Sequence, residues 1–203
     1  MLNNLIQKIL VSKDVVYDRT FFQDTWVSNW DELKYVLKAL IKENESWKKI
    51  LDFGCGPGIM IDFMNDGYTQ YIGCDYSNEA RNLYLEWFGQ NPNLYFREIE
   101  EISLQDIDVL VTFDVFEHMT DKQIDLLLEK CKSIPNYLFN ISRNRLIPGH
   151  INIKSDSAWL SFFGRHNLFI DEQNTNHLRN CYLKMRPIHQ DLWHKNLFVL
   201  TKE

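Results

Sequence analysis

Several marks of particular protein classes are scarce in this sequence of 203 residues. There are only four cysteines, none in a C-x-x-C spacing, so reduced thiols are the simplest interpretation. No apolar run approaches the length of a transmembrane span. Residues 1–10 have apolar side chains at helical intervals and lack the unbroken apolar region and cleavage site of a signal peptide. We therefore expect a cytoplasmic protein without a membrane partner.

Positive charge is also in short supply. The chain has 22 Lys and Arg against 28 Asp and Glu, a net charge of −6, and its basic residues are scattered. Dedicated nucleic-acid-binding proteins gather basic residues on one face, so a nucleic-acid partner is disfavoured. With 45% hydrophobic residues and no linker, repeat or low-complexity tract, the sequence predicts one domain over residues 1–203. Residues 1–47 form a helical and aromatic N-terminal cap in this prediction, and residues 48–203 form the ligand-binding core. The aromatic side chains of the cap are expected in packing, with a lid over a ligand as the alternative.

A glycine-rich stretch follows the first predicted strand, residues 48–53. Gly54, Gly56 and Gly58 occupy alternate positions and precede a short predicted helix over residues 59–64. Glycine adopts positive φ at little cost and lets a ligand approach the backbone closely. Asp52 places a carboxylate at the end of the strand, where it suits a cationic group such as an ammonium. The pattern therefore predicts a binding loop, although a glycine-rich turn without a ligand is also compatible with it.

After residues 48–53, further strands are predicted over residues 69–74, 94–96, 107–113, 136–141, 167–170 and 196–200. Cap residues predict further helices that begin near residue 28, after Ser77, after the capping box of Thr120 and Gln123, and after Ser155. The segment between the last two strands is interpreted as a polar link.

Strands and helices alternate in this order along most of the chain. Short connections between them imply a parallel sheet with right-handed crossovers, in which a ligand lies across the carboxyl ends of the strands. Four acidic residues end predicted strands, which indicates one shared site: Asp52, Asp75, Glu98 and Asp114. Asp75 lies about 17 residues after Gly58, the place from which a carboxylate accepts both ribose hydroxyls in doubly wound nucleotide sites. A solvated turn aspartate is the alternative interpretation.

The spacing Asp52-x-Gly54-x-Gly56-x-Gly58 departs from the dinucleotide pattern G-x-G-x-x-G, because residue 59 is Ile. Together with Asp75 and the segment Asp114-Val-Phe-Glu-His118, it resembles class I S-adenosylmethionine (SAM) methyltransferases. The similarity runs from about residue 48 to 170 and points to a broad family with ubiquinone-pathway O-methyltransferases and many small-metabolite enzymes. It implies a single Rossmann-like, doubly wound α/β fold. The expected sheet is mostly parallel, with about seven strands, an antiparallel last strand and helices on both faces.

The resemblance also implies how SAM, and its product S-adenosylhomocysteine, would be bound. The glycine loop and Asp52 would face the methionine part, Asp75 the ribose, and Tyr76 the adenine ring. Glu98 would contact the adenine amino group, Ile99 would offer its backbone N–H or an apolar surface, and Asp114 would belong to the same pocket. Of these assignments, Glu98 and Ile99 follow from the resemblance alone, since acidic loops are usually just solvated.

Two histidines are candidates for catalysis. His118 is the first, because imidazole titrates near neutrality and the corresponding family residue faces the active site. His150, which follows Gly149, is the second. A packing or capping role for His118 at the start of a helix is the alternative.

Asp114, Glu117 and His118 lie at positions i, i+3 and i+4, which places them on one side of a helical turn. Two carboxylates and an imidazole suit a divalent ion. Some relatives, including small-RNA 2′-O-methyltransferases, use a similar group with a later histidine, which His150 would supply here. We expect no metal, and keep the set Asp114, Glu117, His118 and His150 as the alternative.

The sequence thus predicts a SAM-dependent methyltransferase that acts on an oxygen or nitrogen atom of a small polar acceptor, such as a sugar or a biosynthetic intermediate. One alternative is a metal-dependent RNA 2′-O-methyltransferase, which the charge balance disfavours. The other is an inactive SAM-binding subunit of a larger assembly.

Overall fold

A computed structural model describes residues 17–64, 69–89, 95–96, 99, 102–147, 149–185 and 195–202. The predicted helix over residues 1–10 and Glu98 lie outside these ranges. The described residues form two compact units, one ending at Val111 and one beginning at Thr112, called here the N-terminal and C-terminal units. No helix of the described part combines the length and apolar character needed to cross a bilayer.

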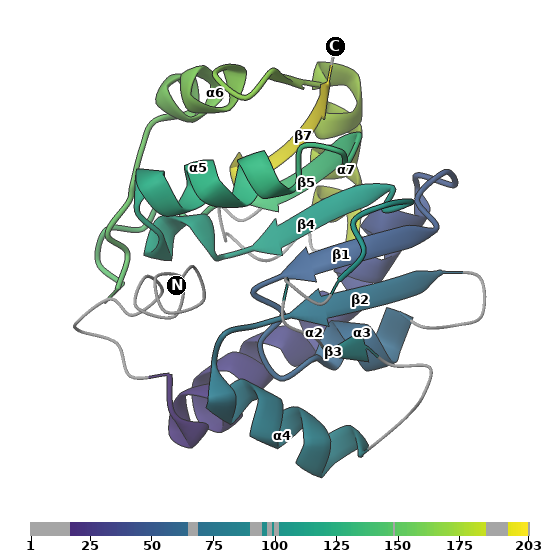
Figure 1. The fold of residues 1–203 in the computed structure, drawn as a ribbon, viewed down its shortest axis with the longest axis vertical. Coiled ribbons are helices and arrows are strands. Elements are labelled where there is room, and N and C mark those ends of the chain that lie inside the picture. The colour runs from purple at the N-terminus through teal and green to yellow at the C-terminus, as the bar shows by residue number, and fades with distance from the viewer. Residues whose placement is uncertain are drawn as a thin grey trace. The chain divides into compact units, whose positions relative to one another are not determined.

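The N-terminal unit is built on parallel strands. β1 pairs with β2 on one side and with β4 on the other, and β2 pairs with β3, always in parallel (Figure 1). Every residue of β4 is buried, and so are the last four of β1 and of β2, as expected of strands covered on both faces. The strands are β1 (Lys49–Phe53), β2 (Gln70–Cys74), β3 (Tyr95–Phe96) and β4 (Val109–Phe113).

Helices of this unit lie where the apolar periodicity predicted them, with one difference. The helix predicted from near residue 28 is present as α2 (Val27–Lys42), and the difference is the π-helical segment η1 (Phe21–Trp26), which precedes it directly and was not predicted. Phe22 packs against Ala80 and Leu83 of α4 (Asn78–Phe88), and this buried apolar contact stabilises η1. The aromatic side chains described there serve packing. A short helix, α3 (Ile59–Met64), follows the glycine loop.

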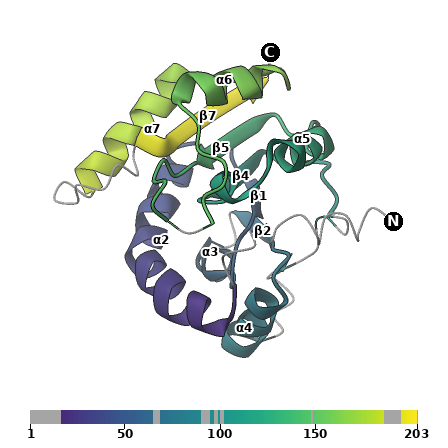
Figure 2. The ribbon, with the colours of Figure 1, turned by 90° about the vertical axis from the view of Figure 1, so that its left-hand side faces the viewer.

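The C-terminal unit ends in an antiparallel arrangement. β7 lies beside β5 (Figure 2) and pairs antiparallel with it and with β6, which confirms the predicted direction of the last strand. Before β5 lie the short 3₁₀ helix η3 (Phe116–His118) and α5 (Asp121–Lys130), whose predicted capping box of Thr120 and Gln123 is present. The remaining elements are β5 (Asn136–Asn140), α6 (Asp156–Gly164), β6 (Leu168–Ile170), α7 (Glu172–Met185) and β7 (Leu197–Lys202).

Helix α7 corrects the sequence analysis, which assigned a polar link between the last two strands. Thr175, Leu178 and Tyr182 are its buried residues, at spacings of three and four. The other positions of the segment are mostly polar, which hid this narrow apolar stripe from a reading of the sequence.

The hydrogen-bonded strand order is β3-β2-β1-β4-β5-β7-β6, a seven-stranded sheet. This order, with parallel strands first and an antiparallel last strand, confirms the predicted Rossmann-like α/β class. The boundary between the two units falls inside β4. A single domain over residues 1–203 stays a prediction.

Candidate functional site

The glycine loop of the N-terminal unit has the backbone that its sequence predicts. Gly54, Gly56 and Gly58 all have positive φ, at 80°, 54° and 74°. The amides of Gly54 and Cys55 donate to the carbonyl of Cys74 at the end of β2, at 2.8 and 3.2 Å. These amides are thus engaged inside the protein, and they tie the loop to β2. The loop therefore allows a ligand to approach the backbone closely at its three glycines, which have no Cβ.

Two glycines make this loop possible by leaving room for their neighbours. A Cβ on Gly58 would lie 2.6 Å from Cδ2 of Tyr84 on α4. A Cβ on Gly73, within β2, would lie 2.6 Å from Sγ of Cys55 and 2.3 Å from Cδ1 of Ile61. Gly73 was not predicted as a site residue, because a glycine inside a strand shows its purpose only once the loop above it is known.

Asp75 links the loop to the turn after β2. Its Oδ2 accepts a hydrogen bond from the amide of Gly56 at 2.9 Å, and its Oδ1 accepts one from the amide of Ser77 at 2.8 Å. Ser77 also caps α4, with its hydroxyl accepting from the amide of Ala80. The ring of Tyr76 packs edge-on against Phe53 at 5.6 Å between centroids. The strand-end carboxylate predicted from sequence therefore stands next to the glycine loop.

Asp52 is almost fully buried, with 3% of its surface exposed. Its Oδ2 accepts a hydrogen bond from the hydroxyl of Tyr71, in β2, at 2.9 Å. Burial raises the pKa of Asp52 to about 7; the Tyr71 hydrogen bond opposes that rise and Asp75 adds to it. Burial also raises the pKa values of Tyr71 and Cys55 well above their usual range. Tyr71 was missed by sequence analysis because its partnership with Asp52 depends on the pairing of β1 with β2.

The remaining predicted cofactor residues are divided between the units. Ile99 is described and buried, with 1% exposed, and Glu98 lies outside the described residues. Asp114 belongs to the C-terminal unit. It follows β4 with φ of 55°, an uncommon conformation for a residue other than glycine and one often found at functional positions.

The second set of candidate residues lies in the C-terminal unit, on and beside η3. Phe116 holds this helix in place: it is fully buried and packs on Phe139 of β5 at 4.7 Å and on Phe163 of α6 at 6.2 Å between ring centroids. Its neighbours in the sequence, Glu117 and His118, are thereby carried on a rigid element.

Glu117 has no exposed surface. Its Oε1 accepts a hydrogen bond from the amide of Ser142 at 2.9 Å, whereas Oε2 has no hydrogen-bond partner among the described residues. Burial, with the charge of Asp114 as a further cause, raises the pKa of Glu117 well above its usual value. Buried carboxylates normally have their hydrogen bonds satisfied, so the unused oxygen is available to a cation or a hydrogen-bond donor.

His118 and His150 meet although they are 32 positions apart. Their rings lie edge to face, 4.6 Å between centroids and at 86°. Nδ1 of His118 lies 3.1 Å from the carbonyl oxygen of Gly149, and Nδ1 of His150 lies 2.7 Å from that of Asn144. Since a carbonyl oxygen only accepts, each Nδ1 carries the proton and each neutral ring presents the lone pair on Nε2.

Burial lowers the pKa of His118 to about 4, with His150 as a second cause and the Gly149 hydrogen bond opposing the shift. Burial also lowers the pKa of His150. Both rings are therefore neutral at pH 7. This is the form in which imidazole accepts a proton or binds a metal ion.

Glu117, His118 and His150 also fit the requirements of a metal site. Each offers one ligand atom, and these three atoms lie within 4.8 Å of one another. A histidine whose Nδ1–H is held by a carbonyl oxygen is the usual orientation of a metal-binding imidazole. Asp114 is not part of this group, so the structure brings together three of the four residues in the alternative ligand set.

Comparisons with known proteins concern the domain type and the fold. A family model described as a methyltransferase domain matches residues 29–138. The fold is similar to magnesium protoporphyrin IX methyltransferase from Synechocystis with bound SAM, at 11% identity and a TM-score of 0.57, covering 91% of this chain and 95% of that one.

Two further solved structures share the fold. A TehB-like SAM-dependent methyltransferase from Corynebacterium glutamicum has 15% identity and a TM-score of 0.59, covering 89% of this chain and 97% of that one. The SAM-bound amino pentose methyltransferase CalS10 from Micromonospora echinaspora has 10% identity and a TM-score of 0.58, covering 93% and 99%. A search of curated proteins finds no match.

Proposed function

This chain belongs to the methyltransferase-domain family, and from that premise we propose that it transfers the methyl group of SAM to an oxygen or nitrogen atom of a small polar acceptor. The observation that carries the proposal is the glycine loop, in which the amide of Gly56 donates a hydrogen bond to the carboxylate of Asp75. Solved structures of similar fold are named as enzymes acting on a porphyrin and on an amino pentose, which supports a small-molecule acceptor.

The residues of the N-terminal unit fit this cofactor. When bound, SAM supplies a methyl group activated by its sulfonium. Gly54, Gly56 and Gly58 adopt positive φ and have no Cβ, so the methionine part can approach the backbone at these positions. Asp75 provides a carboxylate for the ribose hydroxyls, and Asp52 provides a carboxylate for the cationic end. Tyr76 and Ile99 are the proposed apolar neighbours of the adenine.

His118 is the proposed base of the reaction, with His150 beside it. Its Nδ1–H is held by the carbonyl of Gly149, so Nε2 would take the proton from the acceptor. Because its pKa is about 4, His118 is already in the proton-accepting form at pH 7, but it is a weak base there. We therefore assign most of the rate enhancement to the orientation of two bound molecules and a smaller part to proton removal.

A metal-dependent variant of the same reaction is the second candidate, and one observation favours it. Oε2 of Glu117 is buried and accepts no hydrogen bond from the described residues. One ligand atom each of Glu117, His118 and His150 lies within 4.8 Å of the other two. These three residues would hold a divalent ion. Such a site is the sequence feature shared with RNA 2′-O-methyltransferases, against which the net charge of −6 still weighs. The third candidate is an inactive SAM-binding subunit.

The experiment is a methyl-transfer screen with labelled SAM over alcohols, amines and sugars, preceded by thermal melting. We expect SAM and S-adenosylhomocysteine to raise the melting temperature and NAD to leave it unchanged. His118→Ala should slow transfer by about 10²–10⁴-fold and keep SAM affinity. Loss of activity on chelation, restored by added metal, would favour the metal-dependent variant. Binding of SAM without transfer to any acceptor, together with a stable protein partner, would favour the inactive subunit.

A further inference from the structure

We propose that Asn152 is a positioning residue that holds His150 against His118. This inference rests on the proposed function, because it gives Asn152 a purpose only if the two histidines act together. The contacts that carry it lie entirely within the C-terminal unit. They join residues 149–154, which contain no helix or strand, to η3 and to the start of α5.

The backbone of this segment is bonded to η3 on both sides of His150. Before His150, the carbonyl of Gly149 accepts the Nδ1–H of His118 at 3.1 Å. After it, the amides of Ile151 and Asn152 both donate to the carbonyl of Glu117, at 2.8 and 3.0 Å. His150 is therefore carried on a segment that is fastened to the very helix that bears His118.

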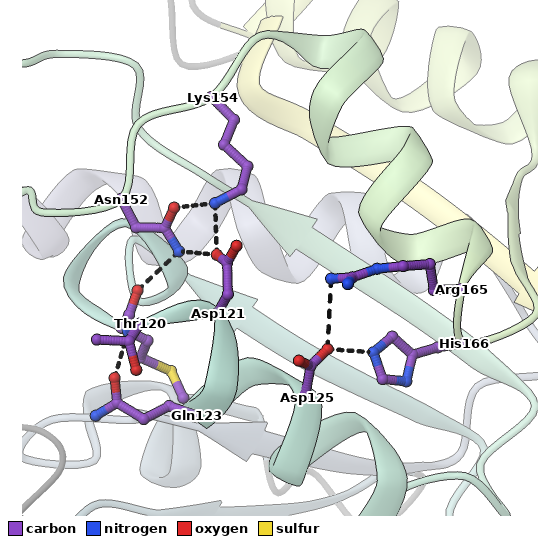
Figure 3. A network of polar contacts seen from close by, with 9 residues as sticks. Thr120, Asp121, Gln123, Asp125, Asn152, Lys154, Arg165 and His166 are labelled. Carbon is purple, nitrogen blue, oxygen red and sulfur yellow. Dashed lines mark hydrogen bonds and ion pairs between the residues drawn. The ribbon is translucent and has the colours of Figure 1, made fainter.

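The side chain of Asn152 secures the end of this segment. Its Nδ2 donates to the carbonyl of Met119 at 2.8 Å and to Oδ1 of Asp121 at 2.9 Å (Figure 3). Its Oδ1 accepts from Nζ of Lys154. With 8% of its surface exposed, Asn152 is one of the buried polar residues of the unit, and both ends of its amide have partners.

Lys154 completes the arrangement. Its ammonium lies 2.5 Å from Oδ1 of Asp121 and 4.5 Å from the ring centre of Trp159 on α6. Figure 3 shows Asn152 and Lys154 converging on Asp121 from one side, while Arg165 and His166 approach Asp125 separately. The Asn152 amide reaches both the carbonyl after η3 and the first residue of α5.

An amide is the group that these contacts require. Its nitrogen supplies two donors to two oxygens, and its oxygen accepts from an ammonium, a combination that Asp or Leu of similar size does not provide. Without those donors, the segment after His150 would keep only its backbone bonds to Glu117 and the more distant contacts of Lys154 among those described here. A displacement of the ring by about 1 Å is enough to lower a rate by about 10²-fold where two groups act in concert.

The test compares Asn152→Leu with Thr175→Val, a matched control in the same unit. Thr175 is a buried polar residue that exchanges hydrogen bonds with Val199, and within the described part of the chain it has no hydrogen bond to η3 or its neighbours. We expect Asn152→Leu to lose the nuclear Overhauser effect between the ring protons of His118 and His150, and to lower kcat by about 10–10²-fold with KM for SAM unchanged. Thr175→Val should keep that signal and a kcat within about two-fold of the wild type. Asn152→Ser, a milder change, keeps the test open if the leucine variant does not fold, and it should weaken the signal and lower kcat to an intermediate value.

An unchanged signal between the two rings in a folded Asn152 variant would overturn the positioning role, whatever the activity. A signal lost together with kcat supports it. If the signal is lost while kcat stays at the wild-type value, Asn152 does set the ring geometry and the failure belongs to the proposed joint action of His118 and His150 in catalysis. The two proposals therefore fail in distinguishable ways.

Discussion

The buried carboxyl of Asp52 makes the stability of this protein depend on pH in a direction opposite to that of most aspartates. Burial raises its pKa from 3.8 to about 7 in the folded protein. A carboxyl that binds its proton more tightly when folded favours the folded state at low pH. That contribution is fully present below about pH 3.8 and is lost as the pH rises toward 7.

With one pKa unit worth about 1.4 kcal/mol, the Asp52 contribution to the free energy of unfolding should fall by roughly 3 kcal/mol between pH 5 and pH 8. Asp52→Asn cannot ionise and still offers an oxygen to the Tyr71 hydroxyl. Its stability relative to the wild type should therefore rise by about this amount over the same interval.

The assay is urea unfolding followed by circular dichroism at each pH from 5 to 9, for the wild type and Asp52→Asn. Tyr71→Phe serves as a second variant. It removes the hydrogen bond that opposes the shift, so the pH at which the wild-type curve levels off should move upward. A stability difference between Asp52→Asn and the wild type that stays constant from pH 5 to 8 would refute the reasoning, because it would mean an ordinary pKa for Asp52.

Three further predictions concern the same sites. Asp75→Ala should weaken SAM binding at least about ten-fold, measured by calorimetry, because it removes the proposed ribose partner and the acceptor of the Gly56 and Ser77 amides. Unchanged affinity would mean that Asp75 does not contact SAM. Gly58→Ala should cost about 1–3 kcal/mol in urea unfolding, since its φ is +74° and its Cβ would strike Tyr84; a loss below about 0.5 kcal/mol would contradict the packing. The pH–rate profile should show no protonation step of His118 between pH 5 and 8, because burial lowers its pKa to about 4. A protonation step in this range, assigned to the His118 ring by nuclear magnetic resonance, would be evidence against that burial.

The local elements of the fold were largely open to prediction from sequence. Apolar runs of the length of a strand, followed by glycine or by a carboxylate, predicted β1, β2 and β4 within two residues of their bounds. Cap residues predicted helix starts where the side chain has a partner three residues away, as at Ser77 and Ser155. Each of these signals is local, since every partner lies within a few positions of the residue that needs it.

The same reasoning failed where a distant partner decides the outcome. Helix α7 was missed because polar residues interrupt its buried stripe of Thr175, Leu178 and Tyr182. The contact of this stripe with β7, as between Thr175 and Val199, is visible only in the folded chain. Segment η1, which precedes α2, was not predicted, because the packing of Phe22 against α4 is not visible in the segment itself.

For the candidate site, the sequence determined the chemistry and the tertiary structure decided the partnerships. The residue types and spacing of Asp52, the glycines, Asp75 and Asp114 to His118 were sufficient to predict a methyltransferase, and the family match confirms it. Whether Asp52 is ionised depends on its burial and, to a smaller degree, on Tyr71, which β-sheet pairing places beside it. Whether His150 acts with His118 depends on a segment that returns to η3 after 32 residues and is fastened there by Asn152. Burial and contact across such distances are properties of the folded chain, because they arise from which surfaces pack together, and no local spacing encodes them.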